Sequence, residues 1–326
     1  MKRAFITGIT GQDGSYLAEL LLSKDYEIYG LIRRTSTTGT WRLASILDRL
    51  RLIPGDMTDS GSLERALKLA DPQEVYNLAS QSSVSHSFEV PLHTSDVTGL
   101  GALRLFEAVR QFCPEAHVYQ ASSSEQFGQP VESPQDEETP FNPVSPYACA
   151  KVFAHHCAKI YRSAYKLYIT CGIAFNHESP LRGSEFVSQK ICQAVARIKR
   201  KAQFVLRLGS LEAKRDWNHA RDIVKGVWLS LQQPQPDDYV FASGTSHSVE
   251  EFVDRAFQIA GLNPSEFVVS EPGLFRPLDI PESCGNATKA KRQLGWSPSY
   301  TFDQLVEEMV DAALNPTDIS NPLRTG

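Results

Sequence analysis

The chain has 326 residues, of which 33 are Lys or Arg and 38 are Asp or Glu, so its formal net charge is −5 at pH 7. This length corresponds to roughly two domains, and a composition of 41% hydrophobic residues is enough for a large core. The mildly acidic balance lacks the basic stripe of a nucleic-acid-binding protein, so no nucleic-acid partner is expected. No segment approaches the ~20 apolar residues of a membrane-spanning helix, so no membrane association is expected.

Short runs of β-branched and apolar residues alternate with longer amphipathic stretches in the first half of the chain. The expected strands are Arg3–Thr7, Glu27–Arg33, Leu52–Pro54, Glu74–Leu78, His117–Ala121 and Tyr168–Ala174. The expected helices are Gly14–Ser23, Leu63–Ala70, Gly99–Phe112 and Pro146–Tyr165. This alternation predicts an α/β fold built on a doubly wound, parallel, Rossmann-type sheet.

The alternation of strands and helices weakens after about residue 176, where Gly, Pro and charged residues become more frequent. The predicted division is a Rossmann-type domain over residues 1–176 and a second, smaller α/β substrate domain over residues 177–326. We expect the segment 216–245 to return and pack on the first domain, which makes the substrate domain discontinuous.

The cysteine and histidine patterns bear on compartment and metal binding. Six widely spaced cysteines form no CxxC pair, which favours reduced thiols and predicts a cytoplasmic protein. The adjacent His155 and His156 would point about 100° apart on a helix. Neither has a carboxylate at ligand spacing nearby in the sequence, so no metal site is expected.

A glycine-rich loop follows the first expected strand and opens the first expected helix. Its glycines allow a tight turn and the close approach of a pyrophosphate to the helix N-terminus, although a lone glycine motif is often only a structural turn. Because strand, loop and helix occur in the right order, a dinucleotide site is the better prediction. The residues of this loop expected to bind the cofactor are Gly8, Thr10, Gly11, Gln12, Asp13 and Gly14.

The end of the second expected strand carries Arg33 and Arg34, where an NAD-binding fold usually places an acid for the ribose 2′-hydroxyl. Two guanidinium groups there would pair with a 2′-phosphate, so the sequence predicts NADP over NAD, with residues 1–176 as the NADP-binding domain. Two surface arginines without a ligand are the alternative. Topology also places Asp56 and Met57, at the end of the third strand, beside the adenine.

Tyr147 and Lys151 are four residues apart and therefore share one face of an expected helix. A lysine ammonium beside a phenol stabilises the phenolate and so lowers its pKa. Such a tyrosine can take the proton of an alcohol while the same carbon gives hydride to a nicotinamide.

Ser123 and Glu125 follow the fifth strand, at the edge where ligands bind to a parallel sheet. Ser123 could hold the alcohol, and Glu125 could act as a base or only cap the next turn.

Together these motifs resemble the extended short-chain dehydrogenase/reductases, and within them the GDP-mannose 4,6-dehydratase family. The likeness spans residue 6 to about residue 296 and rests on Gly8–Glu19, Asn77–Ser82, Phe175–Pro180, Ala213–Trp217, Phe275–Pro277 and Leu294–Trp296. It implies a tightly bound NADP that is recycled within each turnover, with Leu78 and Ala79 among its contacts. It also implies that the enzyme acts on a nucleotide sugar as a homodimer or homotetramer.

The resemblance implies a redox-neutral cycle. Tyr147, with Lys151, takes the C4 hydroxyl proton while hydride leaves C4, and Ser123 stands where the family normally has Thr to orient the C4 oxygen. Glu125 then removes the C5 proton as water leaves C6, and hydride returns to C6. Relatives acting on dTDP-glucose carry an aspartate where Ser124 stands, so Glu125 would have to serve as both base and acid.

The resemblance also places the substrate diphosphate against basic side chains, since its two negative charges favour two or more cations. The residues matched to substrate binding are Ser82, Ser83, Asn176, Lys190, Arg215, Arg276 and Asp279. Two of them depart from the family: Asp279 is one methylene shorter than the usual Glu, and Ser83 stands where a His is common. The loop 35–42 keeps the outline of an arm that reaches a neighbouring subunit, but lacks one arginine near Thr40.

Several functions remain open at this point. The leading hypothesis is NADP-dependent dehydration of GDP-mannose, and the nearest alternative is the same reaction on a GDP-manno-heptose, because Ser83 and Ser123 would suit a roomier pocket. A reductase or epimerase of a 4-keto nucleotide sugar is a further alternative, although a simple reductase would not need Glu125. A non-catalytic NADP-sensing module is disfavoured by the intact Ser123, Tyr147 and Lys151.

Overall fold

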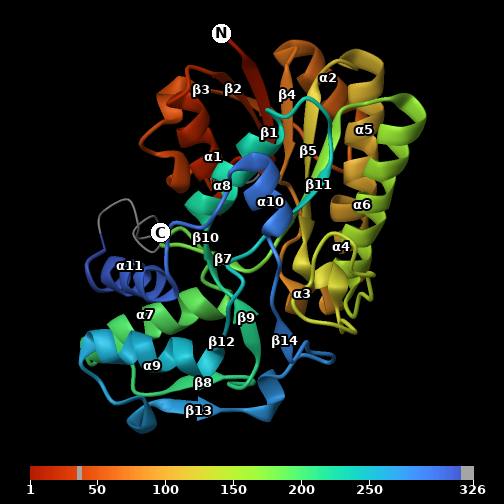
Figure 1. The fold of residues 1–326 in the computed structure, drawn as a ribbon. Helices are drawn as coiled ribbons and strands as arrows, with labels where there is room; N and C mark the ends of the chain where they lie inside the picture. The colour runs from red at the N-terminus through yellow and green to blue at the C-terminus, as the bar shows by residue number, and fades with distance from the viewer. Residues whose placement is uncertain (35–38, 317–326) are drawn as a thin grey trace.

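The computed structural model describes residues 1–34 and 39–316. Within these residues, parallel strands form a seven-stranded sheet in the order β11-β6-β5-β4-β1-β2-β3 (Figure 1). The strands are β1 (Arg3–Thr7), β2 (Glu27–Ile32), β3 (Leu50–Pro54), β4 (Glu74–Asn77), β5 (His117–Ser123), β6 (Ile169–Ala174) and β11 (Asp238–Phe241). The predicted doubly wound sheet is confirmed, and β11 is a strand that the sequence did not predict.

Helices cover both faces of the sheet (Figure 1). Side chains alternate along β1, so that Ala4 and Ile6 pack towards one helical layer and Phe5 towards the other. The first layer contains α1 (Gln12–Leu22), α8 (Ala220–Ser230) and α10 (Thr288–Leu294). The second contains α2 (Ser60–Ala70), α5 (Gly101–Phe112) and α6 (Pro146–Tyr165). Helix α5 begins two residues later than predicted, because a π-helical turn over Ser95–Leu100 leads into it.

Most of the described residues after β6 that lie outside these two layers form a smaller α/β part with its own apolar core (Figure 1). Its helices are α7 (Val187–Lys199), α9 (Val249–Ala260) and α11 (Phe302–Leu314). Its strands are β8 (Leu206–Leu208), β9 (Lys214–Asp216), β12 (Ser246–Ser248), β13 (Val268–Ser270) and β14 (Glu282–Ser283). Two short strands, β7 (His177–Glu178) and β10 (Asn218–His219), pair with each other where the chain passes between the two parts.

The chain returns to the large sheet after β10. Helix α8 packs on α1, β11 pairs with β6, and the later helix α10 packs against both α8 and β11. Trp296 is fully buried in this layer, whereas Trp217 is buried in the core of the smaller part, and both serve packing. The division of domains at residue 176 stays a prediction. Among the described residues, no helix has both the length and the apolar character needed to cross a membrane.

Candidate active site

The carboxyl ends of β1, β4, β5 and β6 open on a cavity of about 1110 Å³ whose opposite wall comes from the smaller part of the chain. This volume exceeds the roughly 300–1000 Å³ of most small-molecule pockets, so the cavity has room for two ligands side by side. Every residue predicted from the sequence as catalytic, cofactor-binding or substrate-binding lines this cavity. The sequence-based candidates therefore meet at one place in the fold.

The glycine loop forms a cradle that a side chain would fill. Gly8 has a φ of +72°, and a Cβ atom there would lie 2.8 Å from the backbone nitrogen of Ala79. A Cβ atom on Gly14 would lie 2.3 Å from the carbonyl oxygen of Gly8. The loop thus leaves the N-terminus of α1 open to the cavity, where backbone N–H groups favour an anion. These residues fit the pyrophosphate of a dinucleotide.

Asp13 ties this loop to the segment that follows β6. Its carboxylate lies 2.8 Å from His177 Nε2, and His177 Nδ1 lies 2.7 Å from the carbonyl oxygen of Phe175. Burial alone would raise the pKa of Asp13, but the charge and hydrogen bond of His177 hold that pKa at about 2. Burial likewise works against the imidazolium, yet Asp13 raises the pKa of His177 above its usual range. The loop is therefore anchored by a charged pair.

The predicted adenosine contacts lie along one rim of the cavity. Arg33 and Arg34 are exposed at the end of β2. Asp56 follows β3 and accepts hydrogen bonds from the backbone N–H and hydroxyl of Thr58, so its carboxylate also fixes its own turn. The arm predicted to reach a neighbouring subunit includes residues 35–38, which lie outside the described residues.

Tyr147 and Lys151 lie on the face of α6 that packs on β5, and both are buried. Lys151 Nζ donates to the carbonyl oxygen of Ala121 at 2.8 Å and lies 5.6 Å from the centre of the Tyr147 ring. The expectation that the tyrosine has a lowered pKa is wrong for this structure. Burial raises the pKa of Tyr147 to about 12, although a hydrogen bond with Ser123 acts in the opposite direction. Burial also lowers the pKa of Lys151 to about 8, so the lysine is still a cation at neutral pH.

Ser123 ends β5 and caps the 3₁₀ turn η4 (Ser124–Phe127). Its hydroxyl accepts from the backbone N–H of Glu125 at 3.3 Å, and its own N–H donates to the side chain of Gln126 at 2.9 Å. The turn is thus capped by Ser123 and not by Glu125. The Glu125 side chain, 14% exposed, faces the cavity with Oε1 3.5 Å from Arg276 Nη1.

Alternating charges continue from Glu125 into the substrate side of the cavity. Asp279 Oδ1 lies 3.6 Å from Arg276 Nη1 and 2.9 Å from Arg215 Nη2. Arg215 is buried on β9, and the neighbouring Asp216 fixes that strand by accepting hydrogen bonds from the backbone N–H groups of residues 243, 244 and 285. Two guanidinium groups joined by one carboxylate can therefore meet an anionic ligand here.

Sequence reasoning missed Arg182, which also lines the cavity. Its Nε lies 3.0 Å from the buried carboxylate of Glu178, and its guanidinium lies 3.5 Å from the centre of the Phe186 ring. Its charge acts to lower the pKa of both Tyr147 and Asp13. The available signal was a basic residue two positions beyond the stretch Phe175–Pro180.

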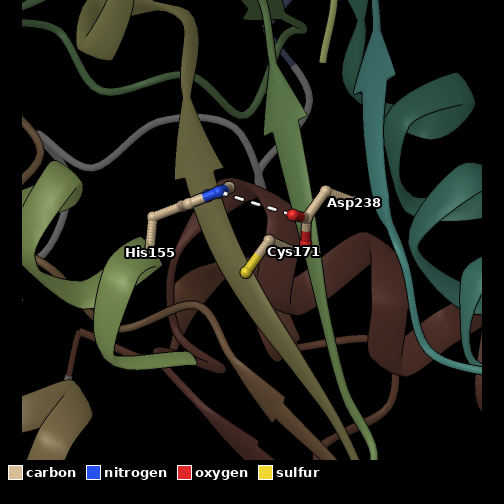
Figure 2. Close-up of side chains that lie close together, drawn as sticks. All are labelled: His155, Cys171 and Asp238. Atoms are coloured by element: carbon tan, nitrogen blue, oxygen red, sulfur yellow. Dashed lines mark ion pairs between the residues drawn. The ribbon is translucent and has the colours of Figure 1, made fainter. Parts of the chain in front are cut away.

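The fold brings to His155 a carboxylate that is distant from it in the sequence. Strand β11 brings Asp238 Oδ2 to 3.5 Å from His155 Nε2, and Cys171 of β6 lies beside both (Figure 2). Asp238 also forms an ion pair with Arg162. The guanidinium of Arg162 already neutralises the charge of this carboxylate, which disfavours binding of a divalent cation at the cluster.

Solved structures share this fold. UDP-glucose 4-epimerase of Thermus thermophilus, in complex with NAD, matches with a TM-score of 0.86 and 25% identity, covering 97% of this chain and 100% of that one. RMD from Pseudomonas aeruginosa, in complex with NADPH, matches with a TM-score of 0.82 and 22% identity, covering 97% and 100%. The sheet, the glycine loop and the Tyr147–Lys151 pair together define a Rossmann-type short-chain dehydrogenase/reductase.

Sequence comparison gives a narrower assignment. The chain belongs to the GDP-mannose 4,6 dehydratase family, whose model matches residues 5–309. GDP-mannose 4,6 dehydratase 1 of Arabidopsis thaliana is 50% identical over 325 residues, covering 96% of this chain and 90% of that protein. GDP-mannose 4,6 dehydratase of Homo sapiens is 44% identical over 336 residues, covering 95% and 90%.

Proposed function

We propose that this protein is an NADP-dependent 4,6-dehydratase that converts GDP-mannose to GDP-4-keto-6-deoxymannose. The observation that carries the proposal is the position of Glu125 in the same cavity as Tyr147, Lys151 and the glycine loop. Oxidising an alcohol needs only the tyrosine, the lysine and the cofactor, whereas eliminating water also needs a base for the C5 proton. The names of the relatives at 44–50% identity support the same substrate.

The cofactor would lie with its pyrophosphate on the glycine loop and its 2′-phosphate near Arg33 and Arg34. When bound, NADP supplies the acceptor for the C4 hydride and the donor for its return to C6. The charged pair of Asp13 and His177 holds the loop in place, and Lys151 adds a cation beside the tyrosine.

Tyr147 and Glu125 act in succession. Tyr147 takes the C4 hydroxyl proton while Ser123 orients that hydroxyl, and the ketone formed at C4 makes the C5 proton acidic. Glu125 takes the C5 proton as the C6–O bond breaks, and then gives this proton to the departing hydroxide, so water leaves and the carboxylate is restored. After hydride returns to C6, C5 takes a proton from solvent and Tyr147 returns its own to solvent.

The proposal is tested by incubating the purified protein in deuterated solvent with GDP-mannose and trace NADP, without added NADPH. We expect a 4-keto-6-deoxy product with solvent deuterium at C5 and no net consumption of cofactor. A requirement for stoichiometric NADPH would instead favour a reductase. Faster turnover of GDP-manno-heptose in a parallel reaction would move the substrate assignment to the larger sugar.

Replacing Arg33 and Arg34 together by Ala is expected to raise the Kd for NADP by about 100-fold or more and to leave the Kd for NAD unchanged. Each charge-assisted hydrogen bond to a 2′-phosphate contributes about 1.5–3 kcal/mol, and NAD has no such phosphate. Isothermal titration with both cofactors measures this. Arg65→Ala, an exposed arginine on α2, is the control. A wild-type protein that binds NAD more tightly than NADP would contradict the cofactor assignment.

We also propose that the enzyme works as a homodimer or homotetramer in the cytoplasm. Phe153 and Ile160 lie seven residues apart on the outer face of α6, 42% and 58% exposed, and Leu100 beside the start of α5 is 43% exposed. A second copy of the chain would cover such an apolar face. The six cysteines are free thiols, which supports a reducing compartment.

A further inference from the structure

We propose that His155 is a positioning residue, which fixes the catalytic helix α6 against the carboxyl end of β5 and so sets the separation of Tyr147 from Ser123. Tyr147, Lys151 and His155 occur at i, i+4 and i+8, so all three share the buried face of α6. His155 is 2% exposed and lies outside the cavity lining. It can therefore act on the reaction only through its neighbours.

The His155 ring bridges the helix to two strands of the sheet. Its Nδ1 lies 2.9 Å from Ser122 Oγ on β5, and its Nε2 lies 3.5 Å from Asp238 Oδ2 on β11. Figure 2 shows the imidazole pointing from α6 across the strands towards Asp238, with Cys171 of the intervening β6 beside them. One ring thus spans the β11-β6-β5 edge of the sheet.

The partners of the ring favour one protonation pattern. A carboxylate accepts, so Nε2–H donates to Asp238 and Nδ1 accepts the hydroxyl proton of Ser122. Arg162 pairs with the same carboxylate from two turns further along α6, and Lys159 Nζ lies 4.0 Å from it. Burial would raise the pKa of Asp238, but the hydrogen bonds from His155 and Arg162 hold it well below its usual range. The carboxylate therefore stays charged and orients the ring.

The bridge ends next to the reacting groups. Ser122 directly precedes Ser123, whose hydroxyl accepts from Glu125 N–H, while the same helix face carries Tyr147 and Lys151. Lys151 makes a second polar contact between helix and β5, to the carbonyl oxygen of Ala121. Loss of the His155 bridge leaves α6 free to shift against β5. A displacement of about 1 Å at reacting groups can cost about 100-fold in rate.

The kinetic test rests on the proposed function and compares three variants at His155 and one control variant, all in the full-length protein with NADP bound. His155→Ala removes both contacts and is expected to lower kcat for GDP-mannose about 10–100-fold with little change in KM. His155→Asn can still accept from Ser122 and should recover most of kcat. His155→Gln places its amide where Nε2 was, towards Asp238, and therefore loses the contact with Ser122. This variant should not recover kcat. Lys159→Ala, which alters the exposed cation near Asp238, is the matched control and should keep the wild-type kcat.

Hydrogen exchange gives a second readout that does not depend on the reaction. The backbone amides of residues 121–125 are expected to exchange faster in His155→Ala than in the wild type, and at the wild-type rate in His155→Asn. If the wild type fails to turn over GDP-mannose, the proposed function falls, but this exchange pattern still tests the bridge.

Three outcomes would overturn the inference. The first is a wild-type kcat in His155→Ala, and the second is an equal loss of kcat in His155→Asn and His155→Ala. The third is a stoichiometric metal in the purified wild type that His155→Ala lacks, because the cluster of His155, Cys171 and Asp238 would then be a metal site. A failure of His155→Ala to fold leaves the comparison of the Asn and Gln variants to decide.

Discussion

Glu125→Gln is expected to stop dehydration while substrate and cofactor still bind. Glutamine has the same shape as glutamate, but its neutral amide cannot take the C5 proton. General base catalysis contributes about 100–10,000-fold, so product formation should fall by that factor. NMR in deuterated solvent measures this directly, because incorporation of deuterium at C5 should disappear together with the product.

Glu132→Gln is the matched control, since Glu132 is an exposed carboxylate a few residues beyond η4. With Tyr147 and Lys151 intact, the Glu125→Gln variant should still oxidise C4 in a single turnover. Normal product formation by that variant would show that another group removes the C5 proton. A large rise in the Kd for GDP-mannose would instead mean that Glu125 mainly positions Arg276, which lies 3.5 Å from it.

Local patterns predicted much of this fold and site. The alternation of short apolar runs with amphipathic stretches placed six strands within two residues of their observed bounds. This works because apolar residues recur with a different period in a strand than in a helix, and that period can be read from a short stretch of sequence. The glycine loop could be recognised for the same reason: strand, turn and helix are consecutive there. The prediction that Tyr147 and Lys151 act together needed only the helical repeat, which places residues four apart on one face.

Contacts between distant segments could not be predicted in this way. Asp238 stands at the start of a four-residue run that becomes a strand only by pairing with β6, so nothing local indicated that it would reach His155. Glu125 and Arg276 are 151 residues apart in the sequence. The pKa of Tyr147 was mispredicted because the neighbouring lysine is visible in the sequence, whereas the burial that dominates that pKa is a property of the folded protein.

Tyr147→Phe is expected to lower kcat by about 100–10,000-fold and to remove the pH dependence of the oxidation step. The pKa of Tyr147 is raised to about 12 by burial, so its phenolate fraction is small at neutral pH and grows as the pH rises. The wild-type kcat/KM should therefore increase between about pH 6 and pH 8. Above about pH 8 Lys151 loses its proton and with it the charge that favours the phenolate, so the increase should weaken there.

Initial rates of the wild type and Tyr147→Phe across this pH range, with cofactor affinity measured in parallel, provide the test. Tyr165→Phe changes a half-exposed tyrosine on the same helix and should keep both the rate and the pH profile of the wild type. Because phenylalanine fills the same space without a hydroxyl, the Tyr147→Phe variant should bind NADP normally. A variant that is slow but still follows the wild-type profile would assign the titrating base to another group, with Glu125 the carboxylate that has the largest effect on the pKa of Tyr147.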